Sequence, residues 1–486
     1  LWADAANGDW SARKALQQTS REKGGIQSLV VSKGSQQAAV ESLQGFYEAR
    51  FAGQGLPDQE EADIMPWHIP SCATEEVLPD IQEIRVHCEK LKTGKTTGMT
   101  EVSADLIKHV LATPGGENVI LQIVHEMILH PESVPEAAWN GLVILLAKVR
   151  VVVDPKQTRP IVLTEAVTKL VARICTARVV SCWPVPHEMM GGRPGGQVAE
   201  AAFFAKHLVM RCSMFQNQDQ TVFVKVDLAA AYDSLQHQGI RSCMRAYFKP
   251  QAELSTRFMD FLISNQQLTF AALGEVWGMR MRRGTVQGGT HSPVLFSYVL
   301  AILCMHLKDE WVAKGEDPPF EAAGILLWFL WFVDDGLLCF KDIHQVRRLF
   351  PRFLRALASI GLGVNLAKSQ ILGCNLPLRL PDCLAGIERV SQTVFLGIPL
   401  AIREHDTYIV HSFCRRAVNA FFSSWKLFTH TGAAILTRIS MFDRLITSTI
   451  RWALGMVQPS AANLAAIRIQ GVTLVLWMLK LRGHPA

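Results

Sequence analysis

The sequence predicts a folded α+β protein made of several subdomains. The chain has 486 residues, which is enough for a substantial hydrophobic core. It is 49% hydrophobic and 19% charged, a balance that is typical of globular proteins and not of disordered ones. Stretches with helical periodicity also alternate with short apolar runs of the length that strands usually have.

The first part of the chain is polar and rich in Gly and Gln, and we expect one helix in it, Gln36–Phe51, without chemistry. Prolines between 57 and 79 indicate a linker, and helical patterns follow at 79–91, 103–111 and 118–129. The TGKTTG stretch at 93–98 resembles a phosphate loop. However, Glu89 stands where that motif requires glycine, and no strand precedes it, so we reject this interpretation.

A strand is predicted at 141–146, and an extended segment follows at 158–163. Arg159 stands just before Pro160, which holds its backbone extended, so that its planar fork of donors suits a triphosphate. An ordinary surface arginine is the alternative. The glycine cluster at 191–196 would allow close approach of a nucleic-acid backbone, although a plain turn explains it equally well.

Alternating valines predict a strand at 222–226 that ends in Asp227, followed by an Ala-rich helical turn that carries Tyr232. A glycine-rich loop then opens a long apolar helix at about 292–307. Ser292 and Pro293 form a good start for that helix.

Two adjacent aspartates, Asp334 and Asp335, interrupt one of the most apolar windows, LLWFLWFVDDGLLCF at 326–340. The run is too short for a membrane helix, which needs about 20 residues. We expect strands at 326–333 and 337–340 joined by a tight turn at 334–336. Paired carboxylates repel each other unless a cation neutralises them. Taken alone, an Asp-Asp-Gly surface turn is the simpler interpretation.

Six segments resemble, in the same order, motifs of reverse transcriptases from LINE-type non-LTR retrotransposons and, more distantly, from group II introns. They are 159–163 (R-P-I-x-L), 227–233 (D-L-x-x-A-F/Y-D), 287–296 (Q-G-x-x-x-S-P-x-L-F), 332–335 (F/Y-x-D-D), 361–369 (G-L-x-x-N-x-x-K-S) and 396–397 (L-G). Phe332 and Val333 replace the usual Tyr-Ala before the acid pair. Each motif alone is weak, but six in order are specific.

The resemblance implies a right-hand polymerase, here a fragment of a longer polyprotein. We expect an N-terminal extension at 1–75, N-terminal helices and fingers at 76–220, a palm at 221–400 whose antiparallel sheet carries the Asp-Asp hairpin, and a helical thumb at 401–486. It implies an intracellular protein, with the nucleus one plausible location. The scattered cysteines, without a CxxC pair, fit a reducing compartment.

The implied activity is RNA-directed DNA synthesis with two Mg²⁺ ions, or Mn²⁺ in their place. Two such ions lie about 3.5–4 Å apart and need hard oxygen ligands. The resemblance assigns them to Asp227, Asp334 and Asp335, with the main-chain carbonyl of Leu228. The partners would be an RNA template, a DNA primer and deoxynucleoside triphosphates, and we expect no membrane partner.

The resemblance also assigns residues to the nucleotide. Arg159 and Lys148 would hold the triphosphate, and Gln287 with Gly288 would line the nucleotide and template pocket. Lys368 would protonate the departing pyrophosphate, although a plain surface lysine is a serious alternative.

Tyr232 would exclude ribonucleotides by a clash with the 2′-hydroxyl, as the steric gate of the family does, unless it is only a core aromatic residue. Asp233 is expected to be structural.

Residues 412–452 are helical, basic and aromatic, which suits either a thumb that grips duplex phosphates or a packing helix. Two alternative functions remain. An RNA-dependent RNA polymerase is disfavoured by Tyr232, because such enzymes typically carry an acid there. A non-catalytic nucleic-acid-binding scaffold is disfavoured because all three carboxylates are present.

Overall fold

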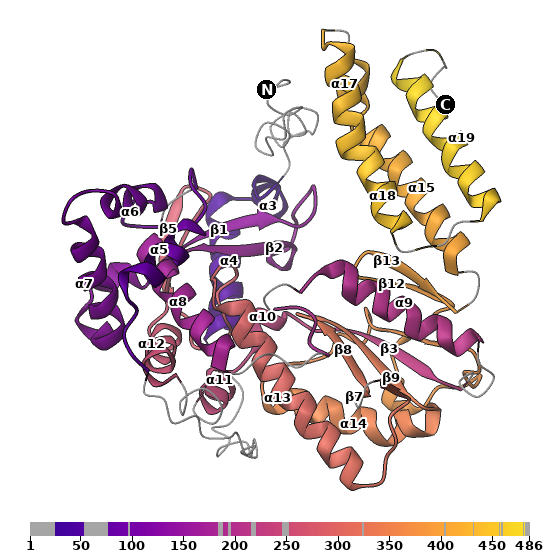
Figure 1. Cartoon of the computed structure of the whole chain (residues 1–486), viewed down its shortest axis with the longest axis horizontal. Helices are drawn as coiled ribbons and strands as arrows, with labels where there is room; N and C mark the ends of the chain where they lie inside the picture. Colours follow the sequence, from indigo (N-terminus) through magenta and orange to yellow (C-terminus); the bar gives the residue numbers. More distant parts are fainter. Residues whose placement is uncertain are drawn as a thin grey trace.

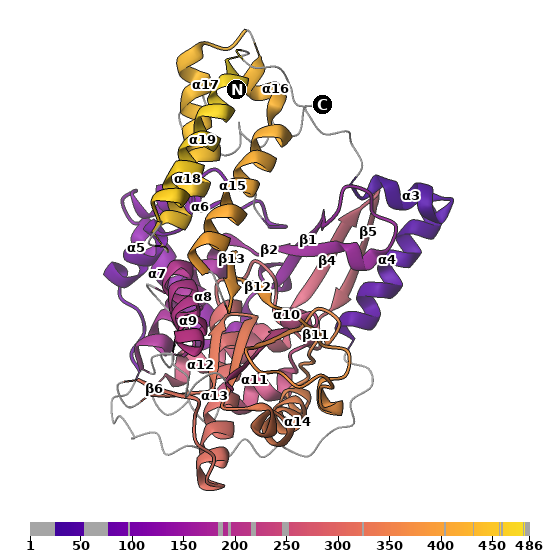
Figure 2. The same ribbon diagram turned by 90° about the vertical axis from the view of Figure 1, so that its right-hand side faces the viewer.

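A computed structural model describes residues 25–52, 76–95, 98–182, 188–192, 196–214, 220–244, 252–322, 325–402, 405–430, 432–455, 457, 460–479 and 481. Figure 1 and Figure 2 show a sheet with helices around it, a second sheet beside it, and a bundle of helices that projects from the second sheet. The predicted α+β class is confirmed.

The first sheet has four strands in the order β2-β1-β4-β5. They are β1 (Asn140–Ala147), β2 (Thr158–Leu163), β4 (Gln267–Ala272) and β5 (Glu275–Arg280). β1 runs antiparallel to β2 and parallel to β4. β4 and β5 join this sheet although their residues fall in the range predicted for the palm, so the predicted domain boundaries remain predictions.

Helices α3 (Gln27–Lys33) and α4 (Gln36–Phe51) pack on this sheet. The helix predicted at 36–51 is confirmed, and its first turn is capped by Ser35, whose side chain accepts a hydrogen bond from the Ala38 amide. Leu43 and Tyr47 are buried against the strands, and the Tyr47 hydroxyl lies 2.6 Å from Thr158 Oγ1. The N-terminal segment is therefore an integral part of the sheet's hydrophobic core.

Helices gather on one side of the first sheet and share one core (Figure 1). They are α5 (Ile81–Glu89), α6 (Ala104–Leu111), α7 (Gly116–Leu129), α8 (Ala166–Cys182) and α12 (Glu253–Ser264). Asp80 and Ser103 cap α5 and α6 by accepting hydrogen bonds from backbone amides of the first turn. Helices near the predicted positions 79–91, 103–111 and 118–129 are thus confirmed.

The second sheet has five strands in the order β11-β10-β3-β9-β8. They are β3 (Val222–Asp227), β8 (Phe329–Phe332), β9 (Asp335–Phe340), β10 (Gln370–Gly373) and β11 (Glu388–Arg389). In β3 the residues Val222, Val224 and Val226 belong to the core shared with α13, whereas Phe223 packs into a second core on the opposite face. Both faces of the sheet are therefore covered.

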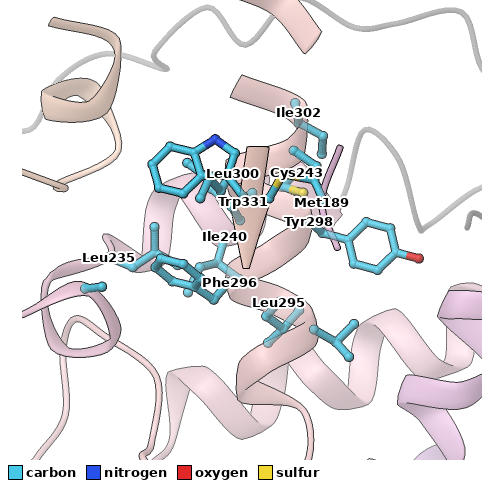
Figure 3. Close-up of a cluster of buried hydrophobic side chains, with 14 of the residues drawn as sticks. Met189, Leu235, Ile240, Cys243, Leu295, Phe296, Tyr298, Leu300, Ile302 and Trp331 are labelled. Atoms are coloured by element: carbon cyan, nitrogen blue, oxygen red, sulfur yellow. The ribbon is translucent and has the colours of Figure 1, made fainter. Parts of the chain in front are cut away.

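Two long helices, α13 (Ser292–Ala313) and α14 (Ile343–Ser359), pack under one face of this sheet. Figure 3 shows side chains of α13 packed with residues near α10 (Ala231–Ser234) and α11 (His237–Cys243) and with Trp331 of β8. The opposite face is covered by α9 (Val198–Met214) and by the hairpin of β12 (Gln392–Phe395) and β13 (Ile398–Ala401).

The predicted position of the acidic turn is wrong. The strands are β7 (Ile325–Leu327), which pairs with β6 (Phe320–Ala322), then β8 and β9, and the turn consists of Val333 and Asp334. Val333 adopts a left-handed backbone (φ 58°), which is unfavourable for a β-branched residue. Gly336 lies inside β9, and the Trp331 ring fills the space that a side chain would take there, so that a Cβ would collide with Trp331 Cζ3.

The glycine cluster packs against this same hairpin. The Trp331 amide donates to the Glu188 carbonyl (2.9 Å), and the Met190 amide donates to the Trp331 carbonyl (2.8 Å), so residues 188–190 extend the sheet beyond β8. A Cβ on Gly191 would lie 2.6 Å from the Val333 nitrogen. Close backbone packing therefore explains Gly191, while residues 193–195 of the cluster lie outside the described part.

The C-terminal helices form a bundle with its own core. They are α15 (His405–Ser423), α16 (Trp425–Thr429), α17 (Ile435–Phe442), a π-helical turn (Asp443–Thr447), α18 (Ser448–Leu454) and α19 (Ala461–Met478). Trp425 packs edge-on against Phe421 (ring centroids 5.5 Å apart), and Trp452 packs against Phe413 (5.6 Å). Packing therefore accounts for these two tryptophans, whereas a grip on nucleic acid stays a prediction.

Two helices of the described part have the length and apolar composition to cross a membrane. In α13, 72% of the apolar window is buried inside the protein, as expected of a core helix, whereas in α19 only 17% is buried. The prediction that the protein has no membrane partner stays untested.

Candidate active site

A cavity of about 600 Å³ opens where the end of β3 and the acidic hairpin face β2. Every predicted site residue except Asp335 lines it. These are Lys148, Arg159, Asp227, Leu228, Tyr232, Gln287, Gly288, Asp334 and Lys368. The structure thus brings together residues that are widely separated in the sequence.

The three predicted acids meet at the ends of neighbouring strands. β3 and β9 are antiparallel, and their register places Asp227 directly opposite Asp335, with Asp334 at the adjoining turn. Burial raises the pKa of Asp334, and the negative charge of Asp227 raises it further. Burial likewise raises the pKa of Asp335, with added repulsion from Asp334 and Asp227. The fold therefore holds together carboxylates whose charges repel.

These acids have the donor chemistry that a hard divalent cation prefers, because carboxylate oxygens are the ligands of Mg²⁺. In the described part of the chain, no three His, Cys, Asp or Glu side chains stand in an arrangement ready to hold an ion. A cation bound between the carboxylates would offset the repulsion of their charges. The donor set therefore fits a divalent cation.

The segment 361–369 fixes the end of β3. The Asp227 amide donates to Ser369 Oγ (3.1 Å), the Asn365 amide donates to the Asp227 carbonyl (2.8 Å), and the Ala229 amide donates to the Gly363 carbonyl (2.7 Å). Ser369 is fully buried. The backbone on both sides of Asp227 is thus held in place, and the same segment brings Lys368 to the cavity wall.

The glycine-rich loop joins the two sheets at the cavity. The Val162 amide of β2 donates to the Gln287 carbonyl (2.8 Å). Gly288 has φ 114°, a conformation that disfavours other residues, and a Cβ there would lie 2.7 Å from the Val162 carbonyl oxygen. Glycine at position 288 is therefore required by both backbone conformation and space.

Tyr232 is half-buried on the cavity wall, with its ring stacked on Phe296 (centroids 5.1 Å apart, planes at 21°). Burial raises its pKa, and Asp334 contributes to the rise. The ring is therefore neutral and held by packing. It partly belongs to the core, as the alternative interpretation expected, yet it also faces the cavity.

Four basic side chains surround the cavity: Lys148, Arg159, Lys368 and Arg50. Burial lowers the pKa of Lys148, and the nearby charges of Arg50 and Arg159 add to this effect. Arg159 is exposed on β2 and lowers the pKa of Asp334. Basic side chains thus line the cavity together with the carboxylates, a combination that suits an anion bound beside a cation.

The sequence did not indicate Arg50, and Asp233 was expected to be structural. Arg50, at the end of α4, forms an ion pair with Asp233 (Nη2–Oδ2 2.5 Å), whose side chain is 1% exposed. Gln287 Nε2 donates to the other Asp233 oxygen (3.0 Å). Arg50 thus lines the cavity although no chemistry was expected of the N-terminal segment, and that expectation stays untested. No motif links these two residues, since their contact depends on how α4 packs.

A family profile described as "Reverse transcriptase (RNA-dependent DNA polymerase)" matches residues 147–400, more than half of the chain. The chain belongs to the reverse transcriptase family. Its right-hand polymerase fold is thereby confirmed, with the acidic hairpin on the antiparallel palm sheet. Lys148 and Lys368, near opposite ends of the matched range, both line the cavity.

This reverse transcriptase is similar to the Retrovirus-related Pol polyprotein from a type-2 retrotransposable element of Drosophila melanogaster, with 24% identity over 303 residues. The match covers 62% of the chain and 27% of that polyprotein, so the chain spans about a quarter of the relative's length. The predicted affinity with non-LTR retrotransposons is confirmed.

Solved structures of telomerase are also similar, at 12% identity. A Candida tropicalis telomerase with a telomeric RNA fragment has a TM-score of 0.41, covering 74% of this chain and 58% of that one. A structure of the apo telomerase from Candida tropicalis, truncated from the C-terminal domain, has a TM-score of 0.39 and covers 56% of this chain and 55% of that one.

Proposed function

We propose that this reverse transcriptase adds deoxynucleotides to a primer 3′-hydroxyl while it copies RNA, with two divalent cations at Asp227 and Asp334. RNA-directed DNA polymerase is the activity of the family. The observation that carries the finer proposal is the cavity itself, which combines clustered carboxylates, basic side chains and Tyr232.

Asp227, Asp334 and Asp335, with the Leu228 carbonyl, would hold two Mg²⁺ ions, or Mn²⁺ in their place. Such ions, when bound, activate the primer hydroxyl and neutralise the charge that develops on the triphosphate. The protein's own contribution is position: segment 361–369 fixes Asp227, and the strand register brings Asp335 opposite to it. The raised pKa values of Asp334 and Asp335 support this assignment, because carboxylates that repel each other gain from a bound cation.

The basic residues would bind the triphosphate. Arg159 offers a planar fork of donors from an extended strand, and Lys148 adds a second cation. Lys368 lines the same cavity and would donate a proton to the departing pyrophosphate. Gln287 and Gly288 would contact the nucleotide and the template base.

Tyr232 would select the sugar. Its ring cannot move away easily, because Phe296 stacks on it and α13 lies behind it. A 2′-hydroxyl on the incoming nucleotide would collide with a ring in this position, whereas a deoxynucleotide would fit. The proposed substrates are therefore deoxynucleoside triphosphates, an RNA template and a DNA primer.

Primer extension on an RNA template tests the proposal with deoxynucleotides and ribonucleotides in parallel. Wild-type protein is expected to use deoxynucleotides, Tyr232→Ala to gain ribonucleotide incorporation, and Asp334→Ala to lose both. Preference of the wild type for ribonucleotides would indicate an RNA polymerase. Unchanged incorporation by Asp334→Ala would refute the proposed mechanism.

A further inference from the structure

An apolar cavity of about 690 Å³ opens beside α7, away from the active-site cavity, and we call it the α7 cavity. Its lining comes from α7, from the turn that follows this helix and from α8. The apolar residues of the lining include Ile123, Met127, Leu129, Val134, Pro135 and Val167. A concave apolar surface of this kind favours the apolar side chains of a partner.

Polar side chains of the α7 cavity already have partners inside the protein. A ring nitrogen of His125 lies 2.8 Å from the Pro79 carbonyl oxygen, and Ser133 Oγ donates a hydrogen bond to Glu126 Oε1 (2.8 Å). Among the described residues, none of the buried side-chain polar atoms that lack a partner belongs to this lining. The cavity therefore does not require a polar small molecule, and the surface that it offers to a ligand is mainly apolar.

The rim of the α7 cavity is acidic. Glu126 belongs to the lining, and Glu132 and Glu136 are exposed in the turn that follows α7. The sequence contains no lysine or arginine between Lys108 and Lys148, although the net charge of the whole chain is +6. Because a negative surface repels the phosphates of nucleic acid, this rim favours a protein segment that carries a positive charge.

Helix α19 presents an exposed apolar face on the C-terminal bundle. Leu464, Val472 and Leu479 lie on this face at helical spacing, with Ile469 beside them, and all four are exposed. The opposite side of α19, which includes the buried Leu474, packs into the core of the bundle. The bundle therefore uses one side of the helix, and the other side is available to a partner.

A single charge interrupts the exposed face of α19. Arg468 is exposed between Leu464 and Val472, and it is the only charged residue of this helix. A charge in the middle of an apolar face is costly in the hydrocarbon core of a bilayer, so Arg468 disfavours a membrane as the partner. In the α7 cavity the same charge would meet Glu126. The helix and the cavity are thus complementary in both polarity and charge.

We propose that α19 of one molecule binds in the α7 cavity of a second copy of this chain, with Arg468 beside Glu126. Figure 1 shows α7 and α19 at opposite sides of the molecule, so this contact has to join two molecules. An apolar helix face that lies in an apolar cavity is a common mode of protein recognition. Because the two contributing surfaces differ, each molecule offers its helix to one neighbour and its cavity to another, and the association is head to tail.

Sedimentation velocity of the full chain over a range of concentrations, without nucleic acid, tests the proposal. Val472→Glu places a negative charge on the helix face, and Ile123→Glu places one in the cavity. Val31→Glu is the matched control, because Val31 is an exposed apolar residue of a helix, α3, that belongs to neither surface. All three positions are exposed, and thermal unfolding checks that each variant folds.

The average mass of the wild type and of Val31→Glu should rise with concentration, whereas Val472→Glu and Ile123→Glu should each remain monomeric. An equimolar mixture of these two variants should form a dimer and nothing larger, because the mixture retains one intact helix and one intact cavity per pair. Arg468→Glu and Glu126→Lys should each weaken the association about tenfold, and the chain that carries both changes should regain most of it.

A wild type that is monomeric at every concentration, or a mixture that stays monomeric, would overturn the proposal. Loss of association in Val472→Glu but not in Ile123→Glu would overturn it in favour of pairing between two α19 helices. Association that persists in both variants would place the interface elsewhere. Flotation of a monomeric wild type with phosphatidylcholine vesicles, abolished by Val472→Glu, would assign the helix face to a membrane instead. A double charge reversal that restores nothing would refute the pairing of Arg468 with Glu126.

Discussion

Replacement of Arg50 by glutamine tests whether α4 holds the active-site cavity in shape. Asp233 is 1% exposed, and its carboxylate contacts the Arg50 guanidinium at 2.5 Å and the Gln287 amide at 3.0 Å. Removal of one partner from a buried ion pair costs about 3–5 kcal/mol at neutral pH, because the other charge stays buried. Asp233→Asn should cost less, about 1–3 kcal/mol, because Arg50 is 17% exposed and can turn toward water.

The loss of stability caused by Arg50→Gln is expected to increase with pH. Burial raises the pKa of Asp233, and Arg50 opposes that rise. Without Arg50 the pKa of the folded state rises further. The free energy of unfolding is then highest below about pH 4, the ordinary pKa of an aspartate. It falls as the pH rises from there through the raised pKa of the folded state. The variant's deficit should be small under acid conditions and largest near neutrality.

Urea denaturation of wild type, both single variants and the double variant Arg50→Gln/Asp233→Asn, across a pH series, measures these differences. The double variant should lose less stability than the sum of the single losses, because replacing both residues leaves no buried charge without a partner. The KM for deoxynucleotide should also rise in Arg50→Gln, since Asp233 positions Gln287. Additive losses that do not vary with pH would refute this reasoning.

Three further predictions concern single residues. Asp334→Asn should raise the thermal unfolding temperature of the metal-free protein at neutral pH, because the folded state disfavours the charge of Asp334. The gain should vanish below about pH 4, where the carboxyl group is protonated in both states, and an equal gain at all pH values would contradict this prediction. Gly336→Ala should cost about 1–3 kcal/mol in urea denaturation, since its Cβ would meet the Trp331 ring, whereas Gly45→Ala on the open face of α4 should gain about 0.5–1 kcal/mol. Gly288→Ala should raise the KM for deoxynucleotide because the loop must move away from Val162, and an unchanged KM would show that the loop adapts.

Local patterns and motif order were enough to predict much of the site. The alternation of valines located β3 and its terminal Asp227, and the motif order implied that Asp227 meets the acidic hairpin, as the strand register shows. The turn of that hairpin was misplaced because a glycine after two aspartates is a typical turn signal. The space over Gly336 is instead taken by Trp331, a packing interaction between paired strands that the sequence pattern does not reveal.

Features that depend on long-range packing were not predictable. Arg50 reaches Asp233 because α4 packs on the first sheet and its end is tethered to the segment after β5, where the Arg282 amide donates to the Phe51 carbonyl (3.0 Å). A second cavity, of about 380 Å³, likewise takes its lysines and its arginine from α8 and the loop after α5. Each of those residues alone resembles an ordinary surface cation, and the sequence does not reveal that they converge.

The rate of a single deoxynucleotide addition to a primer on an RNA template tests the central claim most directly. Asp227→Asn keeps the shape of the side chain but removes its charge, and Asp317→Asn, at an exposed position that is 76% accessible, is the matched control. Loss of about 4 kcal/mol of transition-state stabilisation, roughly a thousandfold in rate, is expected for Asp227→Asn, with the control unchanged. A rate for Asp227→Asn within a few-fold of wild type would contradict the assignment of this cavity as the polymerase active site.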